Sequence, residues 1–359
     1  MNKKALIAMS GGVDSSVAAY LTKSFGYDCT GVTMKLFDND ETSANYTCCS
    51  LDDVEDARSV CRKIGIPYYV YNYLDSFKEK VIMRFINAYE NGATPNPCID
   101  CNRFIKFKRL FTRADELGFD YVVTGHYACV DFDTERNRFL LKKAADLSKD
   151  QSYVLYFITQ EQLSKTLFPL GNIKKSDVRK IASELDLINA NKHDSQDICF
   201  VYDNKYADFI RKFTGKDYPE GDFIDEKGNI LGRHKGIIAY TVGQRKGLGL
   251  SFPSPMYVKE KDVNNNKIVL CENSHLFSKE LIATDVNFIS VDTITKPVRV
   301  KAKIRYNQQE QSATVTKIDD NTIHVIFDEP QRAITIGQAV VLYDGDIVMG
   351  GGIISELLL

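Results

Sequence analysis

The chain has 359 residues, 44% of them hydrophobic and 26% charged, which is the ordinary composition of a globular protein with about two to three domains. A formal net charge of −2 excludes a strongly basic nucleic-acid coat but leaves room for a local basic patch that binds folded RNA. No apolar run reaches the length of a membrane span and the N-terminal one ends at Ser10, so we expect a cytoplasmic protein with neither signal peptide nor membrane segment.

Expected strands and helices alternate through the first two hundred residues. The strands are expected at Lys4–Met9, Thr30–Leu36, Tyr68–Tyr71 and Tyr121–Thr124, and amphipathic helices at Asp14–Phe25, Leu51–Ile64, Phe77–Tyr89 and Arg103–Leu117. This alternation predicts an α/β domain in which helices cover a parallel sheet.

The character of the chain changes after about residue 200. Gly, Asn and short β-like runs follow, and Val298–Arg305 then alternates apolar with basic residues, which predicts a strand with one buried face. Asp344-Gly345 is a strong hairpin turn signal. The composition thus predicts three domains: a parallel-sheet domain at residues 1–200, a small central domain at 201–280 and a β-barrel at 281–359.

The segment Ser10–Ser16, with sequence SGGVDSS, lies between the first expected strand and the first expected helix. Gly11 and Gly12 let the backbone approach an anion, and the helix N-terminus adds a partial positive charge. The segment is neither a Walker A loop nor G-x-G-x-x-G. A tight turn with a helix cap is the alternative, but the order of strand, loop and helix favours an anion site.

This loop resembles that of the PP-loop ATP pyrophosphatase superfamily, which has an adenine nucleotide α-hydrolase-like fold. Its members cleave ATP between the α- and β-phosphates and adenylate a substrate oxygen. The resemblance implies that ATP binds with Mg²⁺ near Asp14 and with its pyrophosphate end on Ala8, Met9, Ser10, Gly11, Gly12, Val13, Asp14 and Ser15. The loop alone leaves the substrate open, because small-molecule synthetases and tRNA-modifying enzymes share it.

Nine cysteines without an export signal argue against a disulfide framework. Cys101 lies in a proline-bounded loop before an expected helix, where the helix dipole with Arg103 and Lys106 would stabilise a thiolate. Cys199 ends a polar loop at the expected domain junction. We interpret four other cysteines as small buried side chains without a chemical role: Cys29, Cys61, Cys129 and Cys271. The role of Cys48 and Cys49 stays open.

Taken together, these segments resemble the bacterial tRNA-specific 2-thiouridylases over nearly the whole chain. The resemblance rests on Ser10–Ser16, Gly31–Met34, Cys48–Ser50, Thr94–Pro97, Thr124–Ala128, Lys149–Tyr153, Ser195–Phe200, His234–Gly236, Tyr240–Gly247 and Arg305-Tyr306. One departure is clear: many members carry Asp at the position of Cys98, and a thiol does not replace a carboxylate as an acceptor or a base.

The resemblance implies a role for each matching residue. Met34 and Gly125 would contact the adenosine, Cys101 would be the nucleophile, and Cys199 would carry a persulfide. Residues Asn96, Pro97 and Cys98 would meet the target base, and other tRNA contacts would come from His126, Lys149, Asp150, Gln151, Arg305, Tyr306 and Gln338.

The activity implied by the resemblance is ATP-dependent 2-thiolation of the wobble uridine of tRNAs for Lys, Glu and Gln. The base would be adenylated, AMP and pyrophosphate released, and sulfur supplied by a cysteine desulfurase or a sulfur-relay protein. Sulfur would come from a Cys199 persulfide, or from hydrosulfide on a [4Fe–4S] cluster held by Cys98, Cys101 and Cys199. The sequence leaves open this choice, the donor, the oligomeric state and how tRNAs are discriminated.

Two other classes of protein are weighed against this one. A small-molecule ligase of the same superfamily leaves the loop thiols and the barrel without a role, and a non-catalytic RNA-binding protein leaves the phosphate loop unexplained. Among single residues, His126 could be a satisfied loop histidine, Lys149–Gln151 a solvated turn, and Arg305-Tyr306 an exposed strand end.

The expected helix from Arg103 carries a basic run without acids. Its basic residues are Arg103, Lys106, Lys108, Arg109 and Arg113, and Phe104, Phe107 and Phe111 recur between them at helical spacing. This pattern predicts one apolar core face and one basic face suited to a phosphate backbone.

Overall fold

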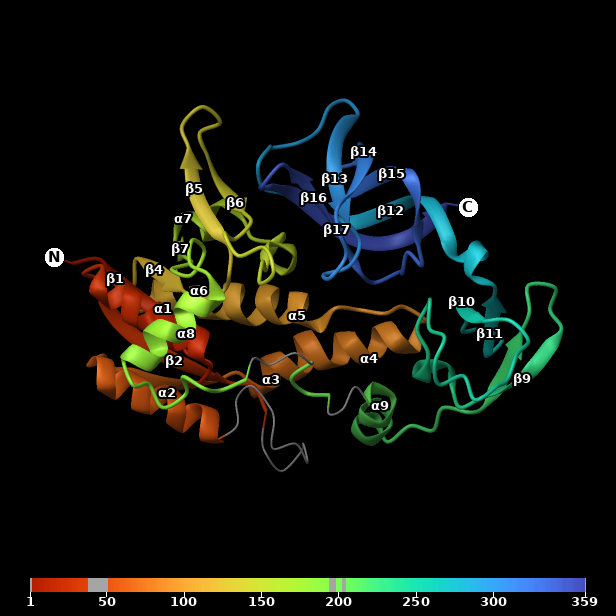
Figure 1. The fold of residues 1–359 in the computed structure, drawn as a ribbon, viewed down its shortest axis with the longest axis horizontal. Helices are drawn as coiled ribbons and strands as arrows, with labels where there is room; N and C mark the ends of the chain where they lie inside the picture. The colour runs from red at the N-terminus through yellow and green to blue at the C-terminus, as the bar shows by residue number, and fades with distance from the viewer. Residues whose placement is uncertain (1, 38–50, 194–197, 202–204, 359) are drawn as a thin grey trace.

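The computed structural model describes residues 2–37, 51–193, 198–201 and 205–358. A parallel-sheet domain containing the N-terminus lies at one end of the molecule and a small β-domain at the other, and a β-barrel packs above the helices between them (Figure 1). Cys48, Cys49 and the segment 194–197 lie outside the described residues.

The N-terminal sheet is parallel throughout. Its strands are β1 (Lys4–Ala8), β2 (Asp28–Lys35), β3 (Tyr68–Asn72), β4 (Tyr121–Val123) and β7 (Thr166–Leu167), in the order β3-β2-β1-β4-β7. The strand order reverses between β1 and β4, and open α/β sheets bind ligands at the carboxyl ends of the strands at such a point. The strands predicted from the sequence are confirmed, apart from shifts at their ends.

Alternate residues of β1 enter two separate cores, because successive side chains of a strand point to opposite faces. Ala5 and Ile7 pack with α1 (Val13–Ser24), α2 (Leu51–Ile64) and α8 (Lys175–Glu184). Leu6 and Ala8 pack on the other face, with the helices of residues 74–90 and 97–116. All four side chains are buried, so both faces of the sheet are covered, as a parallel sheet requires.

Two composite helices form that second layer. The first joins α3 (Leu74–Phe77), η1 (Lys78–Ile82) and α4 (Met83–Glu90), and the second joins α5 (Pro97–Asp100), η2 (Cys101–Arg109) and α6 (Leu110–Glu116). Both η1 and η2 have π-type hydrogen bonding, which is rare and recurs at functional sites.

The second composite helix begins earlier than the expected Arg103. Asn96 is its N-cap and accepts a hydrogen bond from the Cys98 amide at 3.1 Å, and Pro97 follows at a position where proline is favoured. Cys98 therefore lies in the first turn and Cys101 one turn further in, so the prediction that Cys101 lies beside the helix start is wrong. The dipole acts most strongly near Cys98.

The central part of the chain contains a helix and a small sheet. It consists of α9 (Tyr206–Thr214), η5 (Ile237–Ala239), β8 (Gly221–Ile224), β9 (Ile230–His234), β10 (Tyr257–Asp262) and β11 (Lys267–Cys271). The strands follow the order β10-β11-β8-β9. A short turn, η6 (Asn273–Leu276), leads from this part into the barrel.

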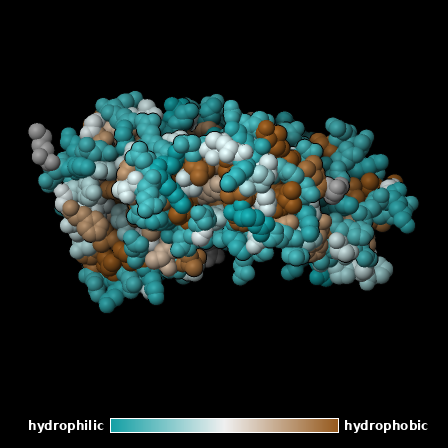
Figure 2. Space-filling view, turned by 90° about the horizontal axis from the view of Figure 1, so that it is seen from above, coloured by the Kyte–Doolittle hydropathy of each residue, from teal (hydrophilic) through white to brown (hydrophobic). Residues whose placement is uncertain are grey.

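Six long strands close the C-terminal barrel. They are β12 (Phe277–Phe288), β13 (Val298–Lys303), β14 (Gln311–Asp319), β15 (Thr322–Arg332), β16 (Ala339–Asp344) and β17 (Ile347–Leu358), and pairing of β12 with β17 completes the ring. The predicted barrel, the strand at Val298 and the hairpin turn at Gly345 are confirmed, with Gly345 at φ +61°. Figure 2 shows a largely hydrophilic surface over the face seen from above, with smaller hydrophobic patches.

The barrel is continuous with the N-terminal part of the chain. The hairpin of β5 (Cys129–Asp133) and β6 (Arg138–Lys142), followed by η3 (Ser152–Leu155) and α7 (Gln160–Ser164), extends the barrel sheet where β6 pairs with β17. The Tyr153 hydroxyl donates to the Ala339 carbonyl at 2.8 Å, and Tyr153 and Tyr343 are buried in one core. Among helices in the described residues, none combines the length and apolar character needed to cross a bilayer.

Candidate active site

The SGGVDSS loop leaves β1 and enters α1 at the predicted position. Gly11 has φ +74°, and a Cβ there would lie 2.4 Å from the carbonyl oxygen of Asp53, so only glycine fits. Gly12 is the N-cap of α1 and supplies no side-chain oxygen to the first-turn N–H groups. Ser15 Oγ accepts from the Ser10 amide at 3.2 Å and fixes the loop. These N–H groups at a helix start fit the phosphates of a nucleotide.

The other residues predicted to bind ATP lie at the ends of neighbouring strands. Met34 is buried near the end of β2, beside β1 in the sheet. Gly125 comes shortly after β4 and packs against the start of α1. A Cβ at this position would lie 2.8 Å from both the Asp14 carbonyl carbon and the Ser15 amide nitrogen. The structure thus brings Ala8–Ser15, Met34 and Gly125 to one edge of the sheet, and their contacts with ATP stay a prediction.

Lys175 supplies a positive charge beside the loop that sequence reasoning missed. Its Nζ lies 2.7 and 2.8 Å from the two carboxylate oxygens of Asp14, and the Tyr127 hydroxyl donates to the same carboxylate at 2.8 Å. Lys175 is the first residue of α8 and is only 8% exposed. This lysine comes from a helix far along the chain, so no local pattern could reveal it.

Asn189, a second residue that the sequence did not reveal, fixes the loop through two hydrogen bonds. Its Nδ2 donates to the Gly11 carbonyl at 2.8 Å and to Ser16 Oγ at 2.9 Å, while its buried Oδ1 has no hydrogen-bond partner among the described residues. Nearby, Lys192 binds Asp53 at 2.6 Å, on the helix whose backbone packs against Gly11. These contacts fix the loop before any ligand arrives.

The three candidate thiols differ in exposure. Cys98 is exposed and Cys101 buried on the same composite helix, and Cys199 is half-buried against the hydrophobic core that includes Cys101. By contrast, burial raises the pKa of Cys29 and of Cys271 to about 11 and that of Cys61 to about 12, which suits inert packing residues. Cys129 is half-buried, and burial raises its pKa as well.

A metal centre at the cysteines finds no support in this geometry. In the parts of the chain that the structure describes, no three or more His, Cys, Asp or Glu side chains are grouped so as to hold a metal ion. A cluster held by Cys98, Cys101 and Cys199 therefore stays a prediction.

Several residues predicted to contact tRNA meet along a seam between the 94–98 loop and the barrel. The Thr94 amide donates to the Ile336 carbonyl at 2.9 Å, and Gln338 Nε2 donates to the Thr94 carbonyl at 2.8 Å. Burial raises the pKa of Tyr306 to about 12, and the nearby Asp150 and Cys98 raise it further. We call this region the Cys98 seam.

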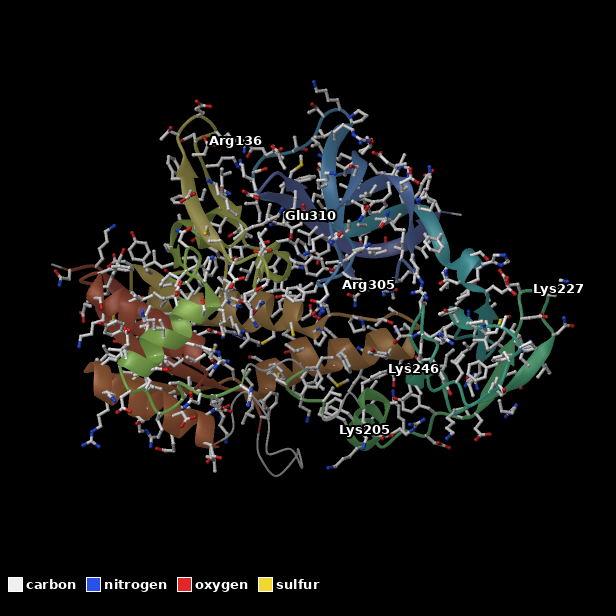
Figure 3. All side chains as sticks on the ribbon, in the orientation of Figure 1. Arg136, Lys205, Lys227, Lys246, Arg305 and Glu310 are labelled. Carbon is white, nitrogen blue, oxygen red and sulfur yellow. The ribbon has the colours of Figure 1, made fainter. Side chains whose placement is uncertain are left out.

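Arg305 lies at the end of the barrel that faces α5 and the central domain (Figure 3). Its guanidinium donates to the Ala333 carbonyl at 2.7 Å and to Thr335 Oγ1 at 3.1 Å. It is half-buried, and its burial together with the nearby Arg332 lowers its pKa. A cation held at such a place would gain from an anionic partner.

Other residues predicted to contact tRNA already make internal contacts. His126 is buried, its Nδ1 lies 2.6 Å from Thr124 Oγ1, and burial lowers its pKa well below the usual value. Gln151 Oε1 accepts from the Tyr127 amide at 2.9 Å, and Asp150 accepts from Ser152 Oγ at 2.7 Å. The environment of His126 is that of a satisfied loop histidine, so a tRNA contact there stays a prediction.

Family models match three consecutive parts of the chain. The tRNA methyl transferase HUP domain matches residues 3–203, the tRNA methyl transferase PRC-barrel domain residues 207–272, and the aminomethyltransferase β-barrel domain residues 278–354. The fold and the loop thus define a HUP-domain protein that carries two further β-domains.

Curated relatives match over the full length. The tRNA-specific 2-thiouridylase MnmA of Clostridioides difficile (strain 630) is 57% identical over 359 residues, which is 100% of this chain and 99% of that protein. That of Acetivibrio thermocellus is 53% identical over 356 residues, covering 98% and 99%. A 4-thiouridine synthetase–RNA complex with bound ATP has 18% identity and a TM-score of 0.36, covering 58% of this chain and 50% of that one.

The chain belongs to the tRNA-specific 2-thiouridylase family. The resemblance seen in the sequence motifs is therefore confirmed.

Proposed function

We propose that this protein is a tRNA 2-thiouridylase that uses ATP and Mg²⁺ to replace the 2-oxygen of the wobble uridine of tRNAs for Lys, Glu and Gln with sulfur. Full-length similarity to curated 2-thiouridylases carries the proposal. The phosphate loop supports it, because it has the geometry of an anion site at the ligand-binding edge of the sheet.

In the first step, the uracil 2-oxygen attacks the α-phosphorus of ATP and pyrophosphate leaves. The loop N–H groups and the start of α1 stabilise the negative charge of the departing pyrophosphate. Lys175 supplies positive charge beside Asp14, which also holds it in place. Bound Mg²⁺ would neutralise phosphate charge, with Asp14 as the residue proposed beside it.

In the second step, a sulfur atom replaces AMP. The terminal sulfur of a Cys199 persulfide attacks C2, and AMP leaves with the former 2-oxygen. A Cys101 thiolate then attacks Cys199 Sγ, which breaks its bond to the transferred sulfur and leaves a Cys101–Cys199 disulfide. An external thiol reductant restores both thiols, and a cysteine desulfurase or sulfur-relay protein reloads Cys199.

The target base must leave the anticodon stack to reach these groups. We propose that it enters at the Cys98 seam, where Gln338 donates to the Thr94 carbonyl, and that Asn96, Pro97 and Cys98 contact it there. In this scheme residues 1–200 perform the chemistry, and residues 201–280 and 281–359 position the tRNA.

Nucleoside mass spectrometry of tRNA after incubation with ATP, a cysteine desulfurase and cysteine tests the function. We expect 2-thiouridine, with AMP and pyrophosphate released only when tRNA is present. Pyrophosphate release with a small-molecule acceptor and no tRNA would instead indicate a ligase. Binding of tRNA without ATP cleavage would indicate a non-catalytic RNA-binding protein.

Hydrosulfide on an iron–sulfur cluster is the rival source of sulfur, and Cys98 separates the two routes. Cys98→Ala should still thiolate tRNA with a desulfurase in iron-free buffer that contains Mg²⁺ if the persulfide route operates. A loss of thiolation in Cys98→Ala, together with broad absorbance near ~400 nm in the iron-reconstituted wild type alone, would establish the cluster instead.

A further inference from the structure

A groove lined by four cationic side chains lies between the two composite helices, apart from the phosphate loop. It encloses about 380 Å³ and is lined by Lys80 and Arg84 from the first helix and by Phe104, Lys108 and Arg109 from the second. We call it the basic groove. Lys108, Arg109 and Arg84 are exposed and Lys80 is half-buried, so their charged ends are accessible from solvent.

The aromatic ring of Phe104 lines the groove beside the cations. The guanidinium of Arg84 lies 5.0 Å from the Phe104 ring centre, and that of Arg103 lies 5.3 Å from it. Phe107 and Phe111 turn into the core as predicted, and Phe104 is half-buried among these cations. Stacking on the ring keeps the guanidiniums in fixed positions.

The acids near the groove leave an excess of positive charge. Asp100 pairs with Arg84 at 3.2 Å, Glu79 pairs with Lys80 at 2.6 Å, and Asp285 of the barrel pairs with Arg103. Within the described residues, neither Lys108 nor Arg109 forms an ion pair, and Arg109 adds to the effect of Lys80 in lowering the pKa of Glu79. The surface therefore suits a ligand with repeated negative charges better than a single carboxylate.

We propose that the basic groove binds backbone phosphates of the tRNA, which deepens the proposed function by adding a site outside the reacting centre. Cys98 lies in the first turn of the composite helix that carries Lys108 and Arg109, and ten residues would span about 15 Å in an α-helix and somewhat less through the π-type η2. The groove therefore receives phosphates several nucleotides from the target base. It contributes affinity and orientation and takes no part in the chemistry.

A triple variant, Lys80→Gln with Lys108→Gln and Arg109→Gln, tests the proposal and leaves the Arg84–Asp100 pair intact. We expect tRNA affinity at low salt to fall at least about tenfold. The slope of log affinity against log salt should become shallower by about one for each lost phosphate contact. The rate at saturating tRNA and the persulfide loading of Cys199 should match wild type.

The matched control is Arg62→Gln with Lys63→Gln and Lys180→Gln, which removes the same charge from exposed positions of α2 and α8, on the opposite face of the N-terminal sheet. This control should bind tRNA with the affinity and salt slope of wild type. Thermal unfolding of both variants separates a loss of binding from a loss of fold.

The other outcomes overturn the proposal. If both triple variants bind tRNA with the same affinity as each other, while the wild type thiolates tRNA normally, the groove holds no tRNA. Unchanged tRNA binding with slower sulfur loading from the desulfurase would assign the groove to an acidic protein partner. Failure of the wild type to bind or thiolate tRNA would remove the proposed function itself, which is a distinguishable result.

Discussion

The phosphate loop and the Cys98 seam are built in opposite ways. The loop is one continuous segment between β1 and α1, and Asn189 and Lys175, from distant parts of the chain, hold it in place while Lys175 also brings a positive charge beside it. The seam joins the 94–98 loop to separate segments around Asp150, Tyr306 and Gln338. Under the proposed function, activation of the base would depend on one rigid element, whereas binding of tRNA would depend on the docking of several segments.

The largest effect should come from the charge pair beneath the loop. Lys175→Gln and Asp14→Ala should each slow tRNA-dependent pyrophosphate release by more than about 100-fold, because each removes one member of the partly buried ion pair beside the phosphates. Binding of tRNA should stay at the wild-type level. The control is Lys180→Gln on the exposed face of α8, and loss of tRNA binding in Lys175→Gln would show that the two regions are not separate.

Cys199→Ser should separate activation from sulfur transfer. We expect AMP formation with tRNA to persist while 2-thiouridine falls below detection, because adenylation precedes sulfur attack. Quantifying AMP and 2-thiouridine in the same reaction checks this. Normal thiolation by Cys199→Ser with a desulfurase as donor would remove the persulfide assignment.

Gln338→Ala should weaken tRNA binding by about threefold to tenfold and leave ATP binding unchanged. The variant loses the bond from Gln338 Nε2 to the Thr94 carbonyl, and such a bond contributes about 1 kcal/mol. Filter binding against Gln309→Ala, on the same domain and exposed, measures the effect. Deleting the whole barrel would not test the same contact, because the deletion would also remove Tyr343, which packs with Tyr153 in a shared core.

The smallest effect concerns Lys261, where the central domain meets the helix that ends at Glu90. Its Nζ donates to the carbonyls of Ala93 and Tyr240 at 3.3 and 3.1 Å, and burial lowers its pKa to about 8. Because an unfolded lysine titrates near 10.4, the unfolded chain holds more protons between about pH 8 and 10. The free energy of unfolding should therefore rise with pH in this window, by at most about 3 kcal/mol.

Urea unfolding at several pH values checks that sign. Lys261→Met should remove this rise, and Lys279→Met, at an exposed position, should retain it. A wild-type stability that falls from about pH 8 to 10 would contradict the assignment of a neutral buried lysine at high pH.

The sequence predicted the elements whose causes are local. The period of the apolar residues located the strands and helices of the first domain, and the glycines and serines located the phosphate loop. Lys175 and Asn189 were missed because nothing in the sequence around them indicates a binding role. They reach Asp14 and Ser16 of the loop only when α8 and the residues after it pack against α1. The start of the Cys98 helix was misplaced because the cap at Asn96 and Pro97 was interpreted as part of a loop.

The central claim is that the uridine oxygen leaves with AMP. The most direct test is a single turnover on an anticodon stem–loop whose wobble uridine carries ¹⁸O at position 2, followed by mass spectrometry of the AMP. We predict one labelled oxygen in the AMP phosphate for each 2-thiouridine formed. Unlabelled AMP alongside 2-thiouridine would contradict activation of the base by adenylation.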